Sequence, residues 1–126
     1  CVVYSGTHDN MTTVGWWKSA SEAQVKQANR YVRYKPHGHK KDEAYENLSF
    51  CRCFLNTLWL SPAHLAIAPV QDFLGLGAEA RINAPGTSEG NWRFRLTPEQ
   101  LEALDIDWIH DLNQAYFRLN KKPEAV

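Results

Sequence analysis

Two short apolar runs, each followed by a polar loop and then by helical periodicity, constrain this chain more than any other feature of its sequence. The first run is residues 1–4 and the second is residues 65–70, in which Pro69 has to lie at the end of the strand. Repeated strand, loop and helix segments are typical of βα units, whose strands pair in parallel. The sequence therefore predicts an α/β fold with its chemistry on the loops that follow the strands.

Three other segments carry apolar side chains at the three- and four-residue spacing of an amphipathic helix. Ser19 and Glu22 are spaced as a capping box at the start of the first segment, and Thr97 is a typical N-cap for the third. Pro62 ends the second. We predict helices over residues 20–33, 43–60 and 97–119, and we expect residues 121–126 to fray.

Length and charge exclude several classes of protein. A chain of 126 residues can bury one core, whereas a complete barrel or two-domain enzyme needs roughly 200 residues or more. Because the first predicted strand is already under way at Cys1, we expect residues 1–126 to be part of a single larger domain. The chain has 14 basic and 14 acidic residues and no apolar stretch of about 18 residues, so we expect neither nucleic acid nor a membrane as partner. Carbohydrate, small molecules and proteins remain open.

Polar side chains follow both predicted strands. His8 and Asp9 come after the first strand, while Glu79 and Asn83 lie in a long glycine-containing loop, residues 75–92, after the second. Parallel strands end at the same edge of a sheet, so these four side chains are expected to converge. The alternative is that an Asx turn closes the first loop and leaves His8 solvated.

Carboxylates and aromatic rings in these loops suggest chemistry on sugars. A retaining glycosidic reaction needs two carboxylates about 5 Å apart, for which Asp9 and Glu79 are candidates and Asp72 is a third by position. The flat apolar rings of Trp16 and Trp17 match the face of a pyranose, although tryptophans near a helix start are more often part of the core.

A metal site and a nucleotide cofactor are both disfavoured. His37 with His39 and Cys51 with Cys53 supply zinc-type ligands, but their spacing does not fit the common zinc motifs. Cys51 also falls on the apolar stripe of the second predicted helix, where a free cysteine acts as a small hydrophobic residue. The chain has no P-loop and no dinucleotide glycine fingerprint, so we predict no metal and no cofactor.

Two longer blocks carry a more specific signal. The first reads Tyr-Ser-Gly-Thr-His-Asp-Asn over residues 4–10 and continues through the tryptophan pair; the second is residues 71–93, with Gln-Asp-Phe-Leu-Gly-Leu-Gly, Glu-Ala-Arg-Ile-Asn and Gly-Asn-Trp-Arg. In order and spacing they resemble the final catalytic block and the C-terminal signature of the 4-alpha-glucanotransferases, the amylomaltase or disproportionating-enzyme family of the alpha-amylase clan.

This resemblance implies a (β/α)8 barrel of which the chain forms the last quarter, with residues 1–4 and 65–70 as strands seven and eight. It also implies transfer of segments of α-1,4-glucans and maltooligosaccharides to glucose or another glucan with retention. Asp9 matches the family's third catalytic carboxylate, and His8 and Asn83 match substrate-binding positions. The nucleophile and the acid/base would lie upstream of Cys1, so the isolated chain is expected to be inactive.

Parts of the sequence depart from the family pattern. Met11 stands where a small acidic or polar residue is usual, and residues 34–60 are unlike the family norm. Glu79, by its place in the second block, is expected to pair with Arg81 rather than to act on substrate. The alternative function is a non-catalytic maltooligosaccharide-binding or interaction module. The expected location is the bacterial cytoplasm or the plastid stroma.

Overall fold

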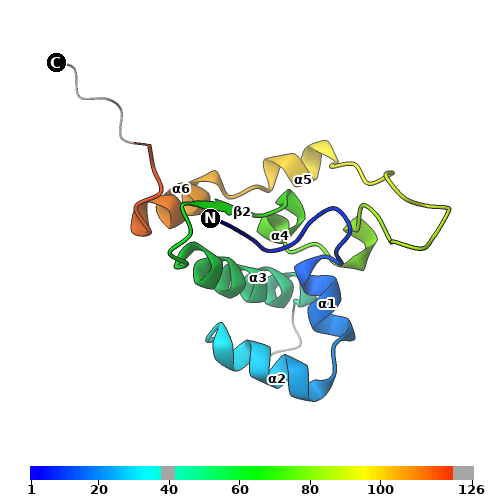
Figure 1. Cartoon of the computed structure of the whole chain (residues 1–126), viewed down its shortest axis with the longest axis horizontal. Helices are drawn as coiled ribbons and strands as arrows, with labels where there is room; N and C mark the ends of the chain where they lie inside the picture. The colour runs from blue at the N-terminus through cyan, green and yellow to red at the C-terminus, as the bar shows by residue number, and fades with distance from the viewer. Residues whose placement is uncertain (38–41, 121–126) are drawn as a thin grey trace.

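The structure is a computed structural model that describes residues 1–37 and 42–120 (Figure 1). None of the helices within these two ranges is long and apolar enough to cross a membrane. The expected frayed tail, residues 121–126, lies outside the described residues. In chain order the elements are β1 (Val2–Tyr4), α1 (Thr13–Ser19), α2 (Glu22–Tyr31), α3 (Glu43–Trp59), β2 (Leu65–Ile67), α4 (Val70–Leu74), the 3-10 helix η1 (Ala78–Ala80), α5 (Pro98–Glu102) and α6 (Ile106–Ala115).

The two strands pair in parallel, as the sequence predicts. Val2 lies beside Leu65 and Tyr4 beside Ile67 in a two-stranded sheet, the one sheet in the described part of the chain. The second strand is shorter than the predicted 65–70, because Pro69 is the N-cap of α4 and the helix begins one residue later. The α/β class of the fold is therefore confirmed, and the predicted end of the second strand is wrong.

Two helices between the strands differ from the prediction. The short helix α1 was not expected; Thr12 caps it by accepting a hydrogen bond from the Gly15 N–H at 3.1 Å. The capping box of α2 is formed by Ser21 and Gln24, not by Ser19 and Glu22, so the helix starts at Glu22. Ser19 is instead the last residue of α1, which explains the two-residue shift.

The C-terminal segment contains two helices where the sequence predicts one over residues 97–119. Thr97 and Gln100 form the expected capping box at the start of α5. That helix ends at Glu102, and Asp105 starts α6 by accepting a hydrogen bond from the Trp108 N–H at 3.0 Å. This backbone hydrogen bond, together with Arg52, lowers the pKa of Asp105. A second N-cap within the segment thus separates the two helices.

The helix α3 forms the centre of the molecule, between α2 on one side and the layer of β2, α4 and α6 on the other (Figure 1). One apolar cluster joins its middle to the segment directly after α2, and another joins its C-terminal half to α6. The buried members are Val32, Tyr34 and Phe50 in the first cluster and Leu55, Trp59 and Leu112 in the second. The predicted placement of α3 and its buried face is confirmed.

Glycine at position 75 allows α4 to pack closely on α3. Its φ of 66° is in the left-handed region, and a Cβ atom there would lie 2.9 Å from the Cα atom of Leu48 in α3. Only glycine meets both conditions without strain. The segment after β2 is therefore fixed against the central helix.

Arg118 fastens the C-terminal segment to the start of β2. Its guanidinium donates hydrogen bonds to the carbonyl oxygens of Trp59 at 3.1 Å, Ser61 at 2.8 Å and Ala63 at 3.0 Å. These carbonyls belong to the end of α3 and the turn that follows it, and helix ends leave such groups without partners along the helix. Arg118 satisfies them with a charged donor.

We expect Arg118→Ala to lower the free energy of unfolding by about 1.5–3 kcal/mol, since hydrogen bonds from charged donors contribute on that scale. Urea unfolding of the chain followed by circular dichroism measures the effect. Arg95→Ala is the matched control, because Arg95 is exposed. Equal unfolding midpoints for the two variants would contradict the assignment.

Candidate functional site

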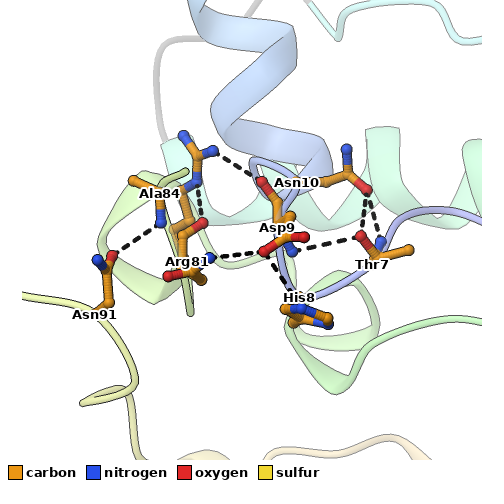
Figure 2. Close-up of polar contacts among 8 residues, drawn as sticks. Thr7, His8, Asp9, Asn10, Arg81, Ala84 and Asn91 are labelled. Atoms are coloured by element: carbon orange, nitrogen blue, oxygen red, sulfur yellow. Dashed lines mark hydrogen bonds and ion pairs between the residues drawn. The ribbon is translucent and has the colours of Figure 1, made fainter. Parts of the chain in front are cut away.

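His8 and Asp9 lie on the loop that follows β1, and Figure 2 shows them beside Arg81 of the second loop. Asn83, also of the second loop, contacts both of them. The Asn83 side-chain Nδ2 donates a hydrogen bond of 2.6 Å to Oδ1 of Asp9, and the Asn83 backbone N–H donates to the carbonyl oxygen of His8 at 3.1 Å. His8 Nε2 lies 3.3 Å from the same Asp9 oxygen. The structure thus brings together three of the four residues that were expected to converge.

Asp9 presents one carboxylate oxygen to the outside. Its side chain is 47% exposed, and Oδ2 accepts no hydrogen bond from residues 1–37 or 42–120. The turn is closed instead by Asn10, whose Oδ1 accepts from the Thr7 N–H at 2.7 Å and from the Thr7 hydroxyl at 3.0 Å. Because Asn10 closes the turn, Asp9 remains available to a ligand.

Arg81 holds the two loops together through backbone carbonyl groups. Its Nη2 donates to the backbone carbonyl of Asp9 at 2.9 Å, and its Nε donates to the carbonyl of Asn83 at 2.9 Å. The expected pairing of Glu79 with Arg81 is wrong. Glu79 turns back on η1, where its Oε1 accepts from the Gly77 N–H at 2.8 Å, and so it takes no part in the site.

Asp72 is not a catalytic candidate. It is 2% exposed, and its oxygens accept hydrogen bonds from the Ser5 hydroxyl at 2.7 Å and the Thr13 N–H at 3.1 Å. A buried carboxylate needs such donors to offset the loss of water. Asp72 therefore anchors both ends of the loop that carries His8 and Asp9.

A cleft of about 170 Å³ opens at the carboxyl ends of β1 and β2. Residues from both loops line it, including His8 and Asn10 from the first and Arg81 from the second, together with Gln71 of α4. In parallel α/β folds this edge of the sheet is where ligands bind. A hydrogen-bonded Asp-Asn pair with one free carboxylate oxygen can bind ligand hydroxyls and stabilise developing positive charge.

Comparison with known proteins matches most of the chain. The family model described as 4-alpha-glucanotransferase matches residues 1–102. The chain belongs to the 4-alpha-glucanotransferase family. It is 39% identical over 115 residues to the 4-alpha-glucanotransferase of Synechocystis sp. This alignment covers 86% of the present chain and 19% of the Synechocystis protein.

A plant relative and a solved structure agree with this result. The chloroplastic/amyloplastic 4-alpha-glucanotransferase of Solanum tuberosum is 33% identical over 121 residues, covering 94% of this chain and 19% of the relative. The amylomaltase from Streptococcus agalactiae in complex with acarbose superposes with a TM-score of 0.80 at 28% identity, covering 94% of this chain and 22% of that one. The chain therefore spans about a fifth of the length of its 4-alpha-glucanotransferase relatives.

The departures from the family pattern fall outside the Asp9 contacts. Residues 34–60 lie within the range that the 4-alpha-glucanotransferase family model matches, and they supply the central helix α3. Met11 packs against Gly15 of α1, where a Cβ atom would come within 2.7 Å of the Met11 sulfur. Neither feature contacts the carboxylate of Asp9 in the described residues.

The tryptophans that suggested sugar binding have other positions. Trp17 stacks on Phe50 with ring centroids 4.3 Å apart and belongs to the core, while Trp16 lies partly exposed on α1. Trp92 lies at the site instead: its ring is 5.1 Å from that of His8, and the residue is 64% exposed. The sequence analysis named Arg81 only as a partner of Glu79 and did not single out Trp92, although both stand in the second family block.

The cysteine and histidine pairs form no cluster of three or more possible metal ligands within the described residues. Cys51 is fully buried, which raises the pKa of its thiol well above the ordinary value, and burial raises the pKa of Cys53 in the same direction. His37 contacts Glu46 at 3.3 Å, and His39 lies outside the described residues.

We expect Asp72→Asn to lower the free energy of unfolding by about 1–3 kcal/mol, because the amide nitrogen cannot accept the hydrogen bond that one carboxylate oxygen accepts now. Thermal unfolding by circular dichroism tests this expectation. Asp111→Asn replaces an exposed carboxylate and should leave the midpoint unchanged. An unchanged midpoint in both variants would show that Asp72 is no anchor.

Proposed function

We propose that the chain is part of a 4-alpha-glucanotransferase that transfers segments of α-1,4-glucans to glucose or another glucan by a retaining double displacement. The observation that carries the proposal is the 2.6 Å hydrogen bond between Asn83 and Asp9 at the carboxyl ends of two parallel strands. Family membership supports the reaction class.

The same proposal makes β1 and β2 the seventh and eighth strands of a (β/α)8 barrel, within one catalytic domain. Val2, Tyr4, Leu65 and Ile67 point to one face of the sheet, and each is about half exposed. On the other face Ala66 packs against the α3 cluster. Parallel sheets are buried on both faces, so the bare apolar face matches the interior of a barrel.

In this reaction Asp9 is the third carboxylate. A carboxylate from another part of the enzyme attacks the anomeric carbon, and a second, protonated carboxyl group donates its proton to the leaving sugar. Asp9 binds sugar hydroxyls with its free oxygen and stabilises the oxocarbenium-like transition state, while His8 and Asn83 contribute further contacts. The chemistry requires neither metal nor cofactor.

The proposed partners are α-1,4-glucans and maltooligosaccharides. The amylomaltase of similar structure was solved in complex with acarbose, which supports a glucan ligand for the enzyme. The relatives include bacterial and chloroplastic enzymes. We infer a bacterial cytoplasmic or plastid stromal location for the enzyme.

The proposed function can be tested in a chimeric enzyme. A chimera in which residues 1–126 replace the matching fifth of the Synechocystis 4-alpha-glucanotransferase should disproportionate maltotriose. Asp9→Asn in that chimera should lower kcat by roughly 10²–10³-fold, the scale of losing one principal transition-state contact. Release of glucose from maltotriose measures the rate.

Asp107→Asn is the control for this experiment, since it makes the same chemical change on an exposed residue of α6. A chimera that folds and binds maltooligosaccharides without converting them would favour the non-catalytic binding module. Full activity of the Asp9→Asn chimera would refute the role of Asp9.

Trp92 should act on substrate binding rather than on the chemical step. We expect Trp92→Ala to raise the KM for maltotriose by roughly threefold to tenfold with little change in kcat, because one aromatic contact contributes about 0.5–1.5 kcal/mol. Trp92→Phe keeps a flat ring and should keep most of the affinity. Steady-state kinetics of the chimera would contradict this if Trp92→Ala left KM unchanged.

A further inference from the structure

Arg81 is the described residue whose side chain reaches the backbone of both functional loops (Figure 2). It comes directly after η1, and its guanidinium bridges the carbonyl oxygens of Asp9 and Asn83, each at 2.9 Å. The side chains of Asp9 and Asn83 are hydrogen-bonded to each other at 2.6 Å, and the Arg81 guanidinium also holds the backbone of both residues.

The acceptors of Arg81 show that its role is geometric. Both are neutral carbonyl oxygens, and no carboxylate in residues 1–37 or 42–120 lies within ion-pair distance of the guanidinium. Glu79, two residues earlier, is engaged with Gly77 instead. A planar guanidinium fixes two acceptors at a set separation, which the single ammonium of lysine cannot do.

Arg81 and Asn83 hold different parts of Asp9, the backbone and the side chain respectively. The Asn83 amide sets the direction of the Asp9 carboxylate by holding Oδ1, and the Asn83 N–H holds the carbonyl of His8. Arg81 fixes the backbone from which the Asp9 side chain projects. Without Arg81, the loop after β1 would keep its anchors at Ser5 and Thr13 and the contacts with Asn83, but it would lose the hydrogen bond that holds the backbone carbonyl of Asp9.

We infer that Arg81 is a positioning residue for Asp9: through the backbone of the loop it sets the orientation in which the free oxygen of Asp9 meets the transition state. This inference rests on the proposed glucanotransferase function. Because misplacement of a catalytic group by about 1 Å can cost 10²-fold in rate, the contribution of Arg81 is a kinetic one.

The experiment uses the full-length chimera described above. Arg81→Ala should lower kcat for maltotriose disproportionation by roughly 10²-fold with little change in KM, since the lost interaction operates in the transition state. Guanidinium ion added to this variant should restore part of kcat. Arg95→Ala is the matched control, because Arg95 is exposed and contacts neither loop in the described residues.

A double-mutant cycle separates positioning from general stability. If Arg81 acts through Asp9, then adding Arg81→Ala to the Asp9→Asn chimera should cause little further loss of kcat. The inference would be overturned if the losses of kcat from Asp9→Asn and Arg81→Ala multiplied in the double variant. A normal kcat in the Arg81→Ala chimera would also overturn it. Should Arg81→Ala fail to fold, Arg81→Lys decides: lysine keeps the charge but cannot bridge both carbonyls, so a normal kcat would overturn the inference.

The outcomes also distinguish this inference from the proposed function. An inactive chimera with the unsubstituted sequence would refute both. An active chimera that loses activity with Asp9→Asn but keeps it with Arg81→Ala would refute the positioning role alone.

Discussion

The carboxylate of Asp72 is almost fully buried, and its oxygens accept hydrogen bonds from Ser5 at the end of β1 and from Thr13 at the start of α1. Burying a carboxylate is costly unless donors surround it, so these bonds form together with the packing of the second βα segment on the first. Asp72 itself lies in α4, which Gly75 holds against α3. One side chain thereby ties both ends of the first loop to α4 and, through α4, to the central helix.

The geometry of Asp9 follows from that anchor. The loop of residues 5–13 is fixed at both ends by Asp72, and its tip is fixed by Asn83 and Arg81 from the second loop. Asn10 satisfies the turn, which leaves one oxygen of Asp9 without a partner among the described residues. A free acceptor on a loop that is held at both ends and at its tip is a preorganised binding group, because little reorganisation is needed when a ligand hydroxyl arrives.

Much of the fold could be predicted because its signals are local. Apolar runs and helical spacing located both strands and α3, and the Thr97 capping box located α5. The short helices α1 and α4 were missed, since a single turn or two presents too few residues for a periodic pattern. The C-terminal segment was predicted as a single helix because its apolar spacing continues across Asp105. In the structure Asp105 is a second N-cap, and it separates α5 from α6.

The contacts that form the site join segments that are far apart in the chain. No local sequence pattern shows which polar residues make these contacts. Asp9 and Asp72 are the same residue type after neighbouring strands, yet one is 47% exposed and the other is buried as an anchor. The bare apolar face of β1 and β2 adds a last constraint. Under the proposed barrel, the strands that cover this face also bring the other two carboxylates to Asp9, so the burial that stabilises the sheet and the step that completes the active site are the same event.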